Sequence, residues 1–214
     1  LAPEVVKKIA DHPDELRLGG EARDVTVLFS DIRNFTTMSE HMTAEQVVSF
    51  LNHVMTPLTR EILKNSGAID KYLGDGLMAY WNAPLEVQDH IDRACTAALA
   101  ITREIQRLKA QSSDMMRDLA IGIGINCGQA FAGNMGSDQR FDYSLVGDTV
   151  NVASRLETTT KQLGVDIVVS DRIAQRSKSH IFVPLGTVKL KGRDEAMTVY
   201  HLLLSLIHIS EPTR

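Results

Sequence analysis

Two aspartates lie where carboxylates could do chemistry. The run VTVLFSD, which begins at Val25, predicts a buried strand that ends at Asp31. Asp75 lies between two glycines, at the tip of a predicted hairpin. If the two strands are neighbours in one sheet, the two carboxylates would suit a hard divalent cation such as Mg²⁺. An ordinary turn aspartate at each position is the alternative.

The segment after Asp31 offers groups that could hold phosphate. Between Ile32 and Thr36 the backbone N–H groups and the Thr36 hydroxyl could wrap around an anion. The alternative is an ordinary loop between a strand and a helix.

A predicted helix at 148–163 carries a polar pair. Asn151 and Arg155 are four residues apart and therefore share one face. A separate, largely apolar stripe can face the core, formed by Val152, Leu156, Thr159 and Leu163. The polar pair could address a ligand, or it could belong to a solvated face.

Three lysines stand in strand-like surroundings. Lys71 lies in an apolar strand, four residues before Asp75, and Lys189 and Lys191 alternate with apolar residues on a later predicted strand. Solvated charges at a sheet edge are the alternative for each lysine.

The elements that must position these residues alternate between strands and helices. Strands are predicted at 24–31, 68–73, 77–81, 119–126, 166–170, 182–189 and 197–202, and helices at 43–62, 88–110 and 148–163. Thr43 and Gln46 form a capping-box pattern at the start of the first helix. Residues 129–135 are expected to pair back onto strand 119–126, and a polar loop from Gly136 is expected to lead into the third helix. The pattern predicts an α/β-type fold with a mixed sheet.

Composition limits the class of protein. The chain has 214 residues, of which 43% are hydrophobic and 23% charged, and its net charge is -4, which is typical of one mid-sized globular domain. A pI near 6.0 argues against a nucleic-acid partner or an anionic membrane surface. Cys95 and Cys127 form neither a disulfide framework nor a zinc site, and two reduced, buried thiols are typical of a cytosolic protein.

The two ends differ from the middle of the chain. Residues 1–20 predict a short helix that connects to an upstream region, and residues 21–203 are expected to form the folded domain. Residues 204–214 (LSLIHISEPTR) match the translation of a common sequencing adapter in one reading frame, so we expect them not to be native. No apolar run reaches the length of about 20 residues that spans a bilayer.

With these residues in order, the chain resembles the catalytic domain of class III nucleotidyl cyclases, the adenylate and guanylate cyclases, over residues 21–203. Five segments carry the resemblance: VTVLFSDIRNFT (25–36), KYLGDGLMAYW (71–81), IGIGINCGQAFAGNMGS (121–137), YSLVGDTVNVASRLE (143–157) and VKLKGR (188–193). Two residues depart from the family pattern. Asn34 replaces a usual glycine, which predicts a stiffer phosphate loop, and Gln129 stands where some members have a phosphate-binding arginine.

The resemblance implies a ferredoxin-like βαββαβ core, with a mixed, mostly antiparallel sheet flanked by helices. It also implies a homodimer with active sites at the interface and two Mg²⁺ (or Mn²⁺) ions at each site. By position, Asp31 and Asp75 would bind the ions, with help from the Ile32 carbonyl. Phe35 and Thr36 would lie at the phosphates. The catalytic domain would be cytoplasmic, following an upstream sensor or membrane-anchoring region.

The remaining site residues follow from the same resemblance. Lys71 and Ser144 would contact the purine, Asn151 would orient the ribose, Arg155 would stabilise charge on the α-phosphate, and Lys191 would hold the outer phosphates. The reaction would be attack of the ribose 3′-oxygen on the α-phosphate, with pyrophosphate leaving.

The base-selecting position favours ATP. Family members that use ATP carry lysine at the position of Lys71, whereas guanylate cyclases typically carry glutamate. Ser144 occupies the second selecting position, where a hydroxyl is compatible with ATP. The expected activity is therefore formation of cyclic AMP. A guanylate cyclase and a non-catalytic regulatory or dimerisation module that keeps the fold are the alternatives.

Overall fold

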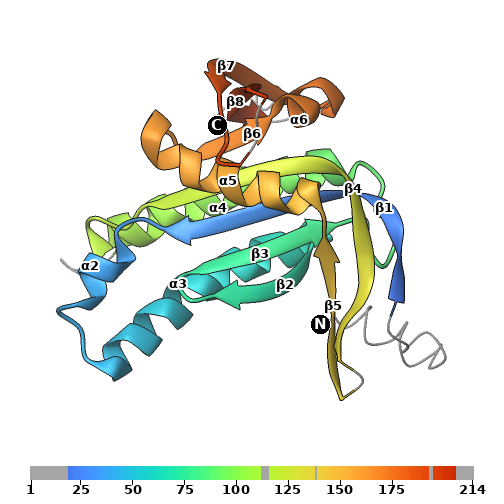
Figure 1. Cartoon of the computed structure of the whole chain (residues 1–214). Helices are drawn as coiled ribbons and strands as arrows, with labels where there is room; N and C mark the ends of the chain where they lie inside the picture. The colour runs from blue at the N-terminus through green and yellow to red at the C-terminus, as the bar shows by residue number, and fades with distance from the viewer. Residues whose placement is uncertain (1–18, 112–115, 138, 193–194, 206–214) are drawn as a thin grey trace.

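The computed structural model describes residues 19–111, 116–137, 139–192 and 195–205. Its sheet has the strand order β2-β3-β1-β4-β6-β8-β7, with β5 paired to β4 (Figure 1). The strands are β1 (Gly19–Ile32), β2 (Ala68–Leu73), β3 (Gly76–Trp81), β4 (Ile121–Ser137), β5 (Arg140–Val146), β6 (Ile167–Ser170), β7 (His180–Val188) and β8 (Met197–Ser205). The helices are α2 (Phe35–Ser39), α3 (Ala44–Lys64), α4 (His90–Gln111), α5 (Asp148–Leu163) and α6 (Asp171–Arg176).

The expected βαββαβ core is present. In chain order it is β1-α3-β2-β3-α4-β4, and in the sheet its strands lie in the order β2-β3-β1-β4, each pair antiparallel. The sheet is mixed because β4 and β6 are parallel. Within this core β1 is the central strand that has both β3 and β4 as neighbours.

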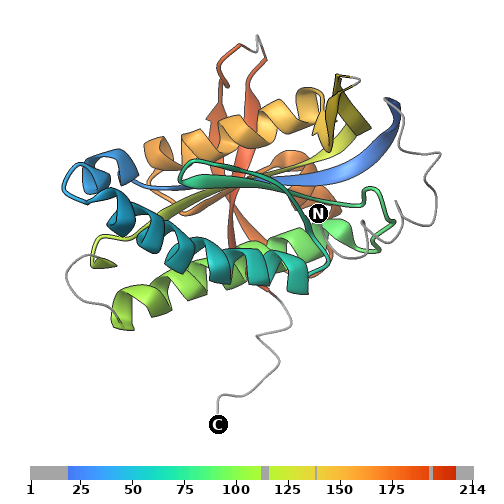
Figure 2. The ribbon, with the colours of Figure 1, turned by 90° about the horizontal axis from the view of Figure 1, so that it is seen from below.

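Helices cover both faces of the sheet. Figure 2 shows α3 and α4 below the strands and α5 above them. The alternation of side chains along β1 explains this arrangement, because Leu28 and Ile32 join the core cluster that includes α3 and α4, whereas Val25 and Val27 join the cluster that includes α5. The central strand is therefore buried on both sides.

Local signals in the sequence explain where several elements begin. Thr43 caps α3 as a capping box, with its side chain accepting from the Gln46 N–H and the Gln46 side chain accepting from the Thr43 N–H. Gly74 and Asp75 form the two-residue connection between β2 and β3, and Gly74 has φ 67°, a conformation that glycine adopts without strain. Both features confirm sequence predictions.

Three sequence predictions about the strands are wrong. Residues 129–135 do not fold back on 119–126: they continue the same strand, since β1 pairs with β4 without interruption from Gly19 to Ile32. The reversal comes later, and β5 occupies the region expected to be a loop. Lys189 and Lys191 lie beyond the end of β7, although both are exposed on either side of buried Leu190.

Other expectations have mixed outcomes. Cys95 and Cys127 are both buried and unbridged, as predicted. The expected helix at the N-terminus lies outside the described residues, except for Gly19 and Gly20, which belong to β1. Strand β8 includes residues 204–205, and residues 206–214 lie outside the described part. Among the described helices, none combines the length and the apolar character needed to cross a membrane.

Helix α5 lies unusually close to β4. A Cβ atom on Gly124 would collide with the backbone nitrogen of Glu157 and the carbonyl oxygen of Ala153, and one on Gly122 would lie 2.5 Å from Thr160 Oγ1. The two glycines therefore let the helix backbone rest directly on the strand.

We predict that Gly124→Ala destabilises the protein much more than Gly164→Ala. The first substitution would force a methyl group against the α5 backbone, which costs roughly 3 kcal/mol. The second places a methyl group in open space at φ 66°, so only backbone strain of about 1 kcal/mol is expected. Urea unfolding of both variants measures the difference, and equal losses would contradict the close approach of α5 to β4.

The start of β7 is tied to α4 by a buried polar cluster. Asp92 Oδ1 accepts hydrogen bonds from Ser177 Oγ (2.6 Å), His180 Nδ1 (3.0 Å) and the Ser179 N–H (3.1 Å). Burial lowers the pKa of His180 below 6.5, although Asp92 acts in the opposite direction. The folded protein therefore keeps His180 neutral more strongly than the unfolded chain does.

We predict that His180 lowers the free energy of unfolding as the pH falls from about 7.5 to about 5.5. Below pH 6.5 the unfolded chain binds a proton at His180 that the folded protein resists, so acid favours unfolding. Urea unfolding at fixed protein concentration measures this change. Asp31 and Glu157, whose pKa values are raised, act in the opposite direction over the same range, so the wild type is compared with His180→Gln. The wild type should lose stability relative to this variant as the pH falls, and a difference that does not change with pH would contradict the prediction.

Candidate active site

The two predicted aspartates meet at one end of the sheet. In the pairing of β1 with β3, Asp31 lies opposite Gly76, the residue that follows Asp75, and the Ile32 N–H donates to the Asp75 carbonyl at 3.3 Å. The missing side chain of Gly76 makes room, since a Cβ there would lie 2.8 Å from Asp31 Oδ1. The register of three strands therefore brings together two carboxylates that are 44 positions apart in the sequence.

This end of the sheet is strongly acidic. Partial burial, together with the charge of Asp75 and a hydrogen bond to it, raises the pKa of Asp31 to about 6. Glu157 on α5 also lies near, and burial together with the charge of Asp31 raises its pKa to about 7. Arg33 acts in the opposite direction on Glu157. A cation would relieve the repulsion between these groups.

The donors at Asp31 and Asp75 fit a hard divalent cation. Both are carboxylates, and the main-chain carbonyl of Ile32 follows Asp31 in sequence. In the part of the chain that the structure describes, no group of three or more His, Cys, Asp or Glu side chains could hold a metal. A cation at this pair would therefore need further oxygens from water or a substrate, as Mg²⁺ commonly does.

Several groups of the loop after Asp31 already have partners within the chain. The N–H groups of Ile32 and Arg33 already donate to carbonyls of Asp75 and Ala120. Phe35 stacks on Phe50, with ring centroids 5.9 Å apart. These groups are therefore less available to a ligand than the sequence predicted.

The start of α2 remains as the part of this loop that can meet an anion. Thr36 is exposed there. Asn34, just before it, has φ 58°, a left-handed conformation that glycine favours and asparagine tolerates. This conformation explains why asparagine can replace the glycine that is usual in the resembling family.

Helix α5 presents its polar pair away from the core. Asn151 is exposed and Arg155 is half-buried, whereas Val152 and Leu156 are buried, as predicted. The guanidinium of Arg155 lies beside Gly192, next to exposed Lys191. Among the described residues, no hydrogen bond or ion pair joins Arg155 or Lys191 to the carboxylate pair.

Lys71 and Ser144 come together on a second part of the site. Lys71 Nζ lies 3.4 Å from Ser144 Oγ, although the two residues are on β2 and β5. Both contact Asp70, whose Oδ1 is 3.0 Å from Lys71 Nζ and whose Oδ2 accepts from Ser144 Oγ at 2.6 Å. The structure thus makes the two residues neighbours and adds a buried acid that contacts both.

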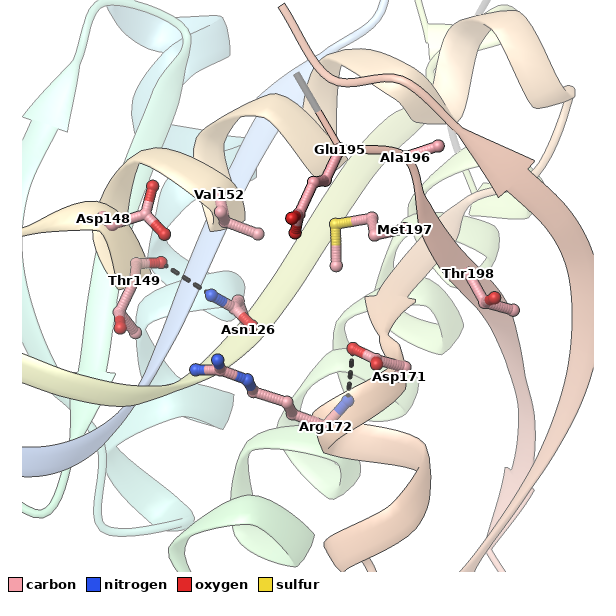
Figure 3. A pocket seen from close by; sticks show the side chains of 10 residues that line it. All are labelled: Asn126, Asp148, Thr149, Val152, Asp171, Arg172, Glu195, Ala196, Met197 and Thr198. Atoms are coloured by element: carbon pink, nitrogen blue, oxygen red, sulfur yellow. Dashed lines mark hydrogen bonds between the residues drawn. The ribbon is translucent and has the colours of Figure 1, made fainter. Parts of the chain in front are cut away.

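A polar cavity of about 300 Å³ lies elsewhere, between the start of α5, α6 and β8 (Figure 3). Asn126 Nδ2 donates to the Thr149 carbonyl at its wall, at 3.0 Å. None of the sequence-predicted site residues lines it: its lining is Asn126, Asp148, Thr149, Val152, Asp171, Arg172, Glu195, Ala196, Met197 and Thr198. The cavity is therefore separate from the carboxylate pair.

Sequence reasoning assigned no role to Asp70 or Glu157. Asp70 precedes Lys71 in an apolar strand, so an acid at an apparently buried position was an available signal. The sequence around Glu157 does not show that this residue lies near Asp31. That closeness depends on Gly122, which lies opposite Asp31 on β4.

Comparisons with known proteins identify the family and the fold of the chain. The sequence profile of the adenylate and guanylate cyclase catalytic domain matches residues 20–203. Adenylate cyclase 1 of Rhizobium meliloti is 36% identical over 190 residues, a match that covers 86% of this chain and 29% of the relative. The chain thus spans less than a third of the length of that protein.

Two solved structures have a similar fold. The adenylyl cyclase CyaB from P. aeruginosa is 29% identical with a TM-score of 0.77, covering 88% of this chain and 97% of that one. The guanylyl cyclase Cya2 is 30% identical with a TM-score of 0.78, covering 86% and 94%. With the profile match over nearly the whole described chain, these likenesses show that the chain belongs to the adenylate and guanylate cyclase catalytic-domain family, the class III nucleotidyl cyclases.

Proposed function

We propose that this chain is an adenylate cyclase that converts ATP to 3′,5′-cyclic AMP and pyrophosphate. The observation that carries the proposal is the pairing of Lys71 with Ser144 in a domain whose Asp31 and Asp75 meet at the strand ends. Similar folds belong to an adenylyl and to a guanylyl cyclase, so the fold alone does not choose the base. Lys71, where guanylate cyclases typically have glutamate, favours ATP over GTP.

Asp31 and Asp75, with the Ile32 carbonyl, would hold two Mg²⁺ or Mn²⁺ ions. Such ions supply neutralisation of phosphate charge and a lowered pKa for a bound hydroxyl. The role of Asp31, Asp75 and the Ile32 carbonyl would be to hold the positively charged ions in fixed positions. The strand pairing that holds both carboxylates allows little movement.

The other residues would bind and orient the nucleotide. Asn151 would position the ribose, Lys191 would hold the outer phosphates, and the start of α2 at Phe35 and Thr36 would border them. Arg155 would stabilise negative charge on the α-phosphate as the 3′-oxygen attacks and pyrophosphate leaves. A guanidinium suits this role because it is always charged and donates several hydrogen bonds.

A homodimer would complete the site. Within one chain Arg155 lies beside Gly192, and no hydrogen bond or ion pair among the described residues joins it to the carboxylates. Its exposed neighbour Asn151 points in the same direction from α5. Two chains would bring the basic residues of one to the acidic pair of the other, giving two shared sites.

We further propose that the domain works in the cytoplasm, where ATP is available, under control of an upstream sensor or membrane-anchoring region. The greater length of the Rhizobium meliloti relative supports a longer full protein.

We predict that two inactive variants restore activity when mixed. Asp75→Ala removes the cation site and Arg155→Ala removes the charge-stabilising group, so each homodimer should make no cyclic AMP from ATP. A mixed dimer keeps one intact site, and random exchange of chains would give about a quarter of wild-type activity. Chromatographic separation of the nucleotides measures the product.

Mixing Asp31→Ala with Asp75→Ala is the matched control, since both changes damage the same half of every site. Activity in that mixture, or none in the first mixture of folded dimers, would contradict shared sites. Full activity of Asp75→Ala alone would contradict the cation assignment.

We predict that Lys71→Glu lowers kcat/KM for ATP by about 100-fold, because it replaces the donor to the base by an acceptor and repels Asp70. GTP should be affected less. Side-by-side assays with both nucleotides test this outcome, and an unchanged preference for ATP would show that another residue selects the base.

A further inference from the structure

We infer that Asp70 sets the base specificity of the site by fixing the direction of the Ser144 hydroxyl. This inference rests on the proposed function, because it concerns how the same site distinguishes ATP from GTP. Asp70 acts through the Ser144 hydroxyl, so it is a positioning residue.

Asp70 is buried and faces both residues. Its side chain is 1% exposed, whereas that of Lys71 is 48% exposed and can still meet a ligand. The three side chains form a closed triangle of contacts, with separations of 2.6 Å for Asp70–Ser144, 3.0 Å for Asp70–Lys71 and 3.4 Å for Lys71–Ser144. A carboxylate this deeply buried needs such partners.

A β-bulge makes the triangle possible. Successive side chains of a regular strand point to opposite faces, so Asp70 and Lys71 would normally diverge. The pairing of β2 with β3 shifts between Ile69 and Lys71, which leaves Asp70 as the extra residue. Bulges redirect side chains in this way, and here both side chains reach Ser144.

The hydrogen bonds in the triangle have fixed directions. An ionised carboxylate only accepts and an ammonium group only donates, whereas a hydroxyl can do both. The Ser144 hydrogen is therefore directed to Asp70, and one lone pair accepts from Lys71. Ser144 keeps one lone pair for a ligand, and Lys71 keeps one of its three hydrogens.

This pattern suits adenine better than guanine. Adenine presents a donor at its 6-amino group and an acceptor at N1, which match the Ser144 lone pair and the Lys71 hydrogen. Guanine presents the reverse order, an acceptor at O6 and a donor at N1. A hydroxyl without Asp70 could rotate to donate to O6, so Asp70 removes the freedom that would let Ser144 accept guanine.

The test is Asp70→Asn, which keeps the shape of the side chain but can donate to Ser144. The ratio of kcat/KM for ATP to that for GTP should fall about tenfold, mostly through KM. Binding of 3′-deoxy-ATP and 3′-deoxy-GTP, measured by calorimetry, should shift in the same direction. Asp118→Asn, the same change at an exposed position, should leave the ratio unchanged.

Ser144→Ala provides the second variant and leaves the buried carboxylate in place. It should also lower the ratio, and adding Asp70→Asn to it should cause little further change, because the two residues act through one hydroxyl. Circular dichroism and the dimer mass confirm that each variant is folded. If Asp70→Asn does not fold, an unchanged ratio in Ser144→Ala overturns the inference.

An unchanged ratio in folded Asp70→Asn, or fully additive effects in the double variant, would also overturn it. These outcomes leave the proposed function intact, since the wild type would still cyclise ATP. A wild type that binds and cyclises neither nucleotide would instead overturn the proposed function, and the inference with it.

Discussion

The close approach of α5 to β4 is the constraint on which the rest of the site depends. Because Gly122 and Gly124 have no side chains, the helix backbone rests on the strand instead of on a layer of side chains. The same strand pairs with β1 along the whole of β1, which carries Asp31. The position of α5 is thereby fixed relative to the carboxylates, and neither can shift without the other.

Much of the fold could be predicted because its signals are local. The capping box at Thr43, the glycine turn at Asp75 and the apolar run before Asp31 each depend on a few neighbouring residues. The course of residues 129–135 could not be predicted in this way. Whether the chain reverses or continues after Gly128 is decided by β1, a distant strand long enough to pair with both halves of β4.

The same distinction between local signals and distant contacts applies to the residues of the candidate site. Residue types and family resemblance were enough to select Asp31, Asp75 and Lys71. Asp70 could be noticed as an acid in an apolar strand, but its contact with Ser144 depends on a bulge in β2, and the position of Glu157 depends on a glycine on β4. The sequence around each residue signals neither the bulge nor the close approach at the glycine. In the sequence alone, an acid next to Lys71 predicts an ordinary ion pair. The fold brings Ser144, which is more than 70 residues away in the sequence, into hydrogen-bond contact with that acid.

The distribution of charge within one chain gives a physical reason for two chains to associate. Asp31, Asp75 and Glu157 gather at one end of the sheet, where burial and neighbouring negative charge raise the pKa values of Asp31 and Glu157. Arg155 and Lys191 lie together at another place, beside Gly192. A polyanionic nucleotide with its cations can neutralise both groups only if it lies between them. In the proposed dimer the substrate would therefore contribute to holding the two subunits in register, and assembly and substrate binding would strengthen each other.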